Sequence, residues 1–162
     1  MEQHVDDGEP GLQLVHLLRT ITVELDLFGA EFARLHQLHP TDVRALIALV
    51  DAERARETAT PGWLAEQLGL DSSSVTALVD RMERLGHVRR HRDPADRRRV
   101  LLELQDQAHA LGWSFFGPLI REAVTAMQSF DETELATAER FLRAMADVVT
   151  ASRRVQDHQG KP

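Results

Sequence analysis

Apolar residues recur at every third or fourth position along three long segments of the chain. The segments run from residue 12 to 35, from 105 to 127 and from 131 to 154. This spacing places the apolar side chains on one face of a helix, so each segment predicts a long amphipathic helix. The three apolar stripes are Leu14, Leu17, Leu18, Ile21, Leu25, Phe28, Phe32 and Leu35; Ala108, Leu111, Phe115, Leu119 and Ala126; Leu135, Ala138, Leu142, Met145 and Val149.

Shorter helical patterns fill the chain between residues 40 and 85. Pro40 interrupts the first stripe, and we expect Thr41 and Asp42 to cap a second helix. The predicted buried face of that helix is Val43, Leu46, Ile47 and Val50. The polar residues 1–10 and 155–162 are expected to form disordered tails.

The stretch TPGWLAEQLGL, residues 60–70, carries the signals of a short helix. Thr60 is expected to cap a helix that begins at Pro61, and Gly69 is expected to end it. Only one residue then precedes Asp71, which is the next capping residue. Two helices joined by so short a turn containing glycine predict a helix-turn-helix.

The second helix of this pair, from about residue 71 to 85, has two different faces. Its apolar face is Val75, Leu78, Val79, Met82 and Leu85. Small hydroxyl residues gather near its start, at Ser72, Ser73, Ser74 and Thr76, and arginines follow at Arg81 and Arg84. A recognition helix needs small residues near base edges and basic residues near phosphates. The alternative is a surface helix whose serines only cap and solubilise it.

After Gly86 the apolar period changes from that of a helix to that of a strand. Residues 87–92 and 98–104 predict two strands around the turn DPADR. A helix-turn-helix followed at once by a β-hairpin is a winged helix. We therefore expect a mainly α fold, in which a winged helix-turn-helix with a wing of two or three strands lies between long terminal helices.

Positive charge is concentrated in this hairpin, although the whole chain has a net charge of −7. Residues 81–99 hold eight arginines against three acidic residues, a net charge of +5, whereas the rest of the chain holds 11 basic and 23 acidic residues. A local basic patch is typical of nucleic-acid binding even in an acidic protein. The alternative is a solvated hairpin whose arginines pair with nearby aspartate and glutamate.

Composition narrows the function classes. The 162 residues fit one domain, or one domain with dimerisation arms, and there is no cysteine for a disulfide, a thiolate metal site or a nucleophile. The first ten residues lack the apolar core of a secretory signal, and we expect a cytoplasmic protein without a membrane span. No phosphate loop, metalloprotease helix or nucleophile elbow occurs, so we expect no enzyme and no cofactor.

Histidine spacing raises a metal hypothesis. His36 and His39 are three residues apart, and Glu31 or Asp42 would add a carboxylate. Pro40 disturbs the helical geometry that this set requires, so polar residues at a helix end are the preferred interpretation and we expect no metal site.

The stretch LAEQLGLDSSSVTALVDRMERLGHVRRHRDPADRRRVLLEL, residues 64–104, resembles the signature of MarR-type winged-helix transcriptional regulators. The flanking helices match that family in order and approximate length. The resemblance implies a homodimer that binds a pseudo-palindromic operator on double-stranded DNA and acts as a repressor. It assigns residues 11–37 and 105–154 to dimerisation helices and residues 38–104 to the DNA-binding domain.

The resemblance also assigns residues to the DNA interface. Ser72, Ser73, Ser74 and Thr76 match the start of the recognition helix, and Arg81 and Arg84 lie further along it. In the wing, Asp96 is expected to steady Arg98, which enters a minor groove, while Arg97 and Arg99 contact the backbone. Ala77 departs from the family, because relatives often carry a larger polar side chain there.

A small-molecule effector is also implied by the resemblance. Its expected site is the crevice between the dimerisation helices and the DNA-binding lobe. The candidate lining residues, each of which also suits a core position, are Phe28, Phe32, His36, Trp63, Trp113 and Phe116. The competing function class is a winged helix that binds an acidic protein partner. Such a module would not need small residues on the recognition helix together with arginine on the wing.

Overall fold

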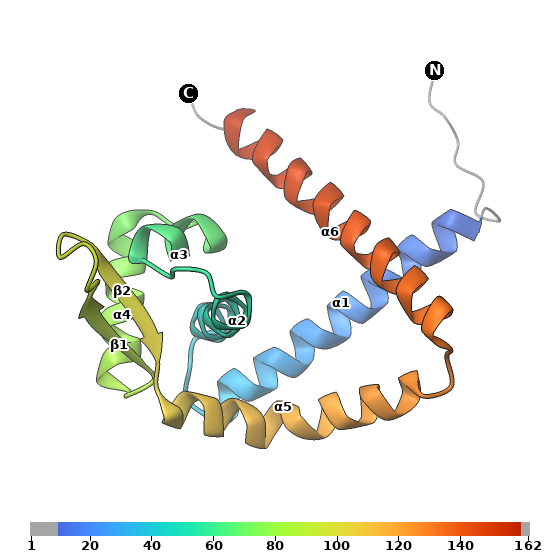
Figure 1. Cartoon of the computed structure of the whole chain (residues 1–162), viewed down its shortest axis with the longest axis horizontal. Coiled ribbons are helices and arrows are strands. Elements are labelled where there is room, and N and C mark those ends of the chain that lie inside the picture. The colour runs from blue at the N-terminus through green and yellow to red at the C-terminus, as the bar shows by residue number, and fades with distance from the viewer. Residues whose placement is uncertain (1–9, 160–162) are drawn as a thin grey trace. The chain divides into compact units, whose positions relative to one another are not determined.

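The computed structural model describes residues 10–159, and its elements follow the expected order (Figure 1). The fold is mainly helical with one antiparallel hairpin, which confirms the predicted class. Residues 1–9 of the expected N-terminal tail lie outside the described residues. The elements are α1 (Pro10–Leu35), α2 (Pro40–Ala55), α3 (Pro61–Leu68), α4 (Ser72–Arg84), β1 (Val88–Arg92), β2 (Val100–Leu104), α5 (Asp106–Met127) and α6 (Glu132–Gln159).

The chain divides into two compact units. The first, Met1–Phe115, contains α1 to α4, the hairpin and the first part of α5, and the second, Phe116–Pro162, contains the rest of α5 and α6. In the second unit α6 continues to Gln159, so residues 155–159 of the expected C-terminal tail are helical, and residues 160–162 lie outside the described residues. Its last turns contain no glycine or proline, the residues that oppose a helix most strongly, and the next ones in the sequence are Gly160 and Pro162.

Helix α2 is the centre of the first unit, where it contacts α1, α3, α4 and β2 (Figure 1). Its side chains Val43, Leu46 and Leu49 are buried with Leu64 of α3. Ile47, which we predicted to be buried, is 49% exposed because it lies on the opposite side of α2. The helix-turn-helix is therefore built around one shared apolar core.

The hairpin is paired in one register, with Val88 opposite Leu104 and Arg92 opposite Val100. Val88 and Leu102 are buried, as the strand alternation predicts. The segment before α3 also joins the hairpin, because the Leu102 N–H donates to the Ala59 carbonyl oxygen at 2.9 Å. This bond fixes the hairpin to the helix-turn-helix.

Local capping explains where the two helices of the helix-turn-helix start. Thr60 Oγ1 accepts a hydrogen bond from the Trp63 N–H at 3.1 Å, and Asp71 Oδ1 accepts one from the Ser74 N–H at 2.8 Å. Gly69 ends α3 with a φ of 65°, a left-handed conformation that favours glycine. These three positions confirm the sequence prediction.

The start of α2 differs from the prediction. His39 is the N-cap and Pro40 is the first helical residue, so Pro40 begins this helix and does not merely interrupt the preceding one. Proline is tolerated there because the first N–H of a helix has no partner within the helix. Asp42 lies in the first turn, where its Oδ2 accepts a hydrogen bond from the His39 N–H at 3.0 Å.

The apolar stripes of α1 and α6 remain largely exposed. Leu17, Ile21 and Leu25 of α1 are each more than half exposed, although Phe32 near the end of the same stripe is buried. In α6, Leu142 and Val149 are also more than half exposed. Exposed apolar surface of this kind marks an interaction site.

No helix between residues 10 and 159 is both long enough and apolar enough to span a membrane.

Candidate nucleic-acid interface

Helix α4 buries one face and exposes the other, as the sequence predicts for a recognition helix. Four apolar side chains are at most 3% exposed: Val75, Leu78, Val79 and Met82. The exposed face holds Ser72, Ser73, Thr76 and Arg84. Leu85 differs from the prediction, because it is the C-cap residue beyond the last turn and is 42% exposed.

The Asp71 carboxylate accepts hydrogen bonds from serine hydroxyl groups at the start of α4. Ser73 Oγ donates to its Oδ1, and Ser74 Oγ donates to its Oδ2 at 2.8 Å. These hydrogen bonds, led by the one from Ser73, hold the pKa of the Asp71 carboxyl well below its usual range. Thr76 Oγ1 donates to the Ser72 carbonyl oxygen at 2.7 Å. Asp71 is therefore the cap of the helix, and the hydroxyl groups of Ser73 and Ser74 hold its carboxylate in place, while each hydroxyl oxygen still has acceptor capacity.

Arg81 is turned toward the protein interior. Its Nε donates to Asp42 Oδ2 at 3.0 Å, and its Nη2 donates to Asp42 Oδ1. The Asp42 side chain is 0% exposed and the Arg81 side chain 29% exposed, and their hydrogen bond raises the pKa of Arg81. Burying this carboxylate without a cation would cost several kcal/mol. The placement of Arg81 thus differs from the exposed one expected for a DNA contact.

Arg90, on β1, ties the hairpin to α4. Its Nη1 lies 2.7 Å from Glu83 Oε2, and its Nη2 lies 2.6 Å from Asp80 Oδ1. The Arg90 N–H donates to Glu83 Oε1 at 3.1 Å, and this bond, followed by the side-chain bond, lowers the pKa of Glu83. Sequence reasoning gave Arg90 no individual role, although acidic residues three apart on a helix face are a signal for such a partner.

The wing turn is held by aspartate side chains that bind the backbone. Asp96 Oδ1 accepts from the Arg98 N–H at 3.0 Å, and Asp93 Oδ1 accepts from the Ala95 N–H at 2.8 Å. We expected Asp96 to steady the Arg98 guanidinium, whereas the structure shows a bond to the Arg98 backbone. A short aspartate side chain readily closes such a turn onto the N–H two residues ahead.

The arginines of residues 81–99 fall into a paired group and an unpaired group. Besides Arg81 and Arg90, Arg89 pairs with Glu103 at 2.6 Å, and Arg99 lies 3.6 Å from Asp93. The pairing alternative raised by the sequence therefore holds for these four. None of the carboxylates that the structure describes is in ion-pair range of the exposed Arg84, Arg92, Arg97 or Arg98, while Arg92 Nη1 donates to the Arg97 carbonyl oxygen at 2.7 Å.

Three of the six candidate effector residues lie together in the first unit. Phe28, Phe32 and His36 surround Phe115, with ring centroids 4.6 Å, 5.0 Å and 6.4 Å from its ring. We refer to these four residues as the aromatic cluster. Phe115 belongs to the helical stripe of α5, and sequence reasoning did not include it in the site. Trp113 is outside the cluster and 57% exposed, and Phe116 begins the second unit.

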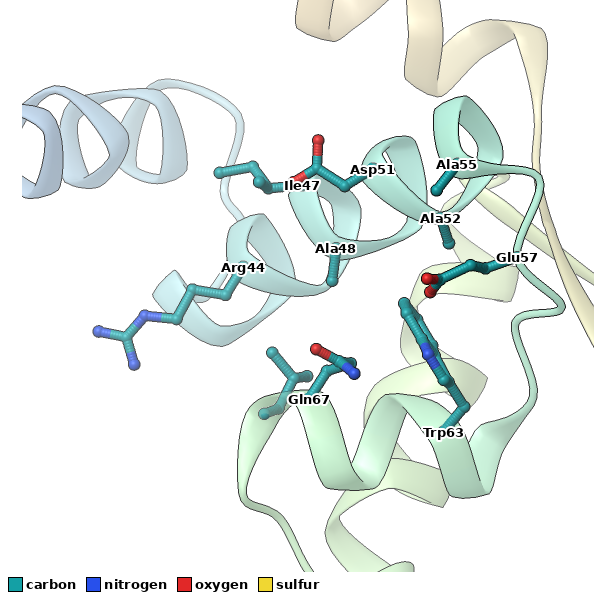
Figure 2. A pocket seen from close by; sticks show the side chains of 10 residues that line it. Arg44, Ile47, Ala48, Asp51, Ala52, Ala55, Glu57, Trp63 and Gln67 are labelled. Atoms are coloured by element: carbon teal, nitrogen blue, oxygen red, sulfur yellow. The ribbon is translucent and has the colours of Figure 1, made fainter. Parts of the chain in front are cut away.

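Trp63 lies in a different place. It lines a groove between α2 and α3, opposite Ala48 and Ala52 (Figure 2). The groove lining contains none of the aromatic-cluster residues. Trp63 and the aromatic cluster therefore do not form one site in the first unit.

His87, between α4 and β1, is a buried polar residue that sequence reasoning missed. It is 6% exposed, and its Nδ1 has no hydrogen-bond partner in the described part of the chain. Burial lowers the pKa of His87, Asp42 opposes this shift and His36 adds to it. The imidazole is therefore held in its neutral form.

The candidate metal site at His36 and His39 lacks a third ligand among the described side chains. Among the side chains that the structure describes, no group of three His, Asp or Glu residues is placed to hold a metal ion. His36 lies against Phe32 with ring centroids 4.7 Å apart, and His39 caps α2.

Comparison with known proteins identifies the family. A family model described as the MarR family matches residues 36–99. An uncharacterized HTH-type transcriptional regulator, YcgE of Bacillus subtilis (strain 168), is 33% identical over 135 residues, which cover 83% of this chain and 85% of that protein.

Solved structures agree. A MarR family protein from Bacillus stearothermophilus is 30% identical, with a TM-score of 0.62 over 85% of this chain and 94% of that one. A mutant of MepR from S. aureus, bound to an oligodeoxyribonucleotide, shares the fold at 19% identity, with a TM-score of 0.55 over 84% of this chain and 97% of that one. The chain thus belongs to the MarR family of winged-helix transcriptional regulators and is not an enzyme.

Proposed function

We propose that this regulator binds a pseudo-palindromic DNA operator as a homodimer and represses transcription, and that a small-molecule effector releases it. DNA binding is supported mainly by one observation: some arginines of residues 81–99 are paired with carboxylates and others are not. Arg84, Arg97 and Arg98 are exposed and have no acidic partner in the described residues. Guanidinium groups without an acidic partner are available to neutralise phosphates.

The two parts of the interface have different tasks in this proposal. Helix α4 enters the major groove, where Ser73 and Thr76 approach base edges. The wing reaches the minor groove with Arg98, while Arg97 and Arg99 contact phosphates. Arg81 acts indirectly, because its bond to Asp42 fixes α4 on α2.

Dimerisation is supported by the exposed apolar stripes of α1 and α6. A homodimer presents two recognition helices related by a two-fold axis, so the operator should contain two inverted half-sites about one helical turn apart. Repression follows when the bound dimer occupies promoter DNA. The MepR neighbour bound to an oligodeoxyribonucleotide supports DNA as the partner.

The effector part is supported by the aromatic cluster. Its rings Phe28, Phe32 and Phe115 offer an apolar surface, and His36 offers a polar atom beside them. An apolar ligand that separated these rings would displace α1 from the start of α5 within the first unit.

The test is operator binding by the full chain. Intergenic DNA beside the gene is searched for an inverted repeat, labelled and titrated, with a scrambled duplex of equal length as control. We expect two chains per operator, tighter binding to the repeat than to the control, and a log affinity that falls with log salt at about 0.9 per contacted phosphate. Equal affinity for the scrambled duplex, or binding that is insensitive to salt, would contradict the proposal.

A further inference from the structure

We propose that the groove between α2 and α3 binds a small organic cation with an apolar body. The groove has a volume of about 420 Å³ and lies entirely within the first unit (Figure 2). Sites of this size hold small ligands up to the size of a drug. The groove is separate from the aromatic cluster, and ligand binding in it does not depend on operator binding.

The groove exists because small side chains on α2 face large ones on α3. Ala48, Ala52 and Ala55 follow one another at helical spacing along its α2 wall. On α3, Trp63 and Gln67 are four residues apart, so both extend from one face of that helix toward α2 (Figure 2). The alanines leave space between the helices that the half-buried indole of Trp63 does not fill.

A carboxylate is placed next to the indole by the end of α2. Arg56 adopts a left-handed conformation with a φ of 55°, and the Glu57 N–H returns to the Ala52 carbonyl oxygen at 2.8 Å. This turn directs the Glu57 carboxylate toward the Trp63 ring (Figure 2). Among the side chains that the structure describes, no cation is in ion-pair range of Glu57 or of the second acidic lining residue, Asp51.

These features select a cation. The face of an indole is electronegative and attracts a cation, and a neighbouring carboxylate adds to that attraction. Arg44 also lines the groove, but its guanidinium extends away from the indole (Figure 2). The alanine wall and Leu68 would cover the apolar body of the ligand while its charge lies between Trp63 and Glu57. An anion of the same shape would be repelled by Glu57 and Asp51.

The experiment uses the full chain and the emission of a single tryptophan. The chain has two tryptophans, so Trp113→Phe leaves Trp63 as the reporter. This protein is titrated with benzyltrimethylammonium and, in parallel, with phenylacetate, which has a similar apolar body and the opposite charge. We expect saturable quenching of Trp63 by the cation and none by the anion.

Two variants in the same background test the assignment. Glu57→Gln should weaken cation binding by about tenfold, because it removes the carboxylate beside the indole and keeps the shape. Glu66→Gln removes the same charge from an exposed position on α3 outside the groove and should leave the affinity unchanged. Absence of saturable cation binding, equal binding of phenylacetate, or an equal loss in both variants would overturn the proposal, provided that the variants melt like the parent.

Discussion

Arg81 and Arg90 lie where the recognition helix and the wing join the rest of the fold, and Arg97 and Arg98 lie in the wing turn. The first two are half-buried and are bound to Asp42, Asp80 and Glu83. The last two are exposed, and in the described chain no carboxylate pairs with them. One residue type therefore occupies two opposite environments less than twenty positions apart.

The difference shows how a small hairpin can be both rigid and available for binding. Ion pairs at its base fix its direction relative to α4 because each joins two elements. In the described chain Arg97 and Arg98 at the tip have no such partners, so their charges can meet a phosphate without first breaking an ion pair. Substitutions at the base should change stability or geometry, and substitutions at the tip should change affinity alone.

Asp42→Ala should have the largest effect, on stability. It removes the partner of Arg81 and the acceptor for the His39 N–H at the start of α2. Breaking a buried pair costs about 3–5 kcal/mol, and we expect about 3 kcal/mol because Arg81 is 29% exposed. Urea unfolding at one fixed protein concentration measures the change. Asp51→Ala on the same helix is the control and should stay within about 0.5 kcal/mol.

Arg98→Ala should have the next largest effect, on operator affinity. Loss of a guanidinium from a narrow minor groove should weaken binding by about 10- to 100-fold, while the unfolding transition stays where it was. Titration of a labelled operator and a thermal melt give both numbers. Arg143→Ala removes the same charge from an α6 ion pair and is the matched control. Wild-type affinity in Arg98→Ala would show that the wing tip does not contact the operator.

Arg90→Gln should give a smaller loss of operator affinity than Arg98→Ala, and it should leave the salt dependence of binding unchanged. It frees Asp80 and Glu83, so the wing is no longer held in one direction relative to α4. We expect binding to weaken by several-fold while the salt slope is unchanged, because Arg90 itself contacts no phosphate in this proposal. A salt slope reduced by about one per site would instead identify Arg90 as a phosphate contact.

His87→Phe should have the smallest effect, which is a change in stability that appears only at acidic pH. Burial lowers the pKa of His87 in the folded state, so the neutral imidazole is favoured there. The stability it contributes is present above the unfolded pKa of about 6.5 and is lost as pH falls through the lower folded value. Melting temperatures at pH 7.5 and pH 5 should therefore differ less in His87→Phe than in the parent. An identical difference in both proteins would show that His87 does not titrate on unfolding.

Much of the helix-turn-helix could be predicted because its signals are local. Thr60, Gly69 and Asp71 each act within four residues, so their roles follow from spacing alone. The apolar face of α4 and the alternation of the strands are equally local. The role of Pro40 was predicted wrongly because a proline can either break a helix or begin one, and here it begins α2 with His39 as the N-cap.

The contacts at the interface were harder to predict from the sequence, because the residues that form them are far apart in the chain. Asp42 and Arg81 are 39 residues apart, and no spacing rule connects them. The same holds for Phe28 and Phe115, whose contact depends on how α1 meets α5 in the first unit. Charge counting identified the basic hairpin correctly, but it could not separate the paired arginines from the unpaired ones.

The two roles of Asp42 also constrain how the operator specificity of this protein can evolve. Its carboxylate serves the start of α2 and the position of α4 at once. A substitution that altered operator preference by moving α4 through this residue would at the same time damage the start of α2. New operator specificities should therefore arise more readily at exposed positions whose side chains hold no second element in place, such as Arg84 and Arg98.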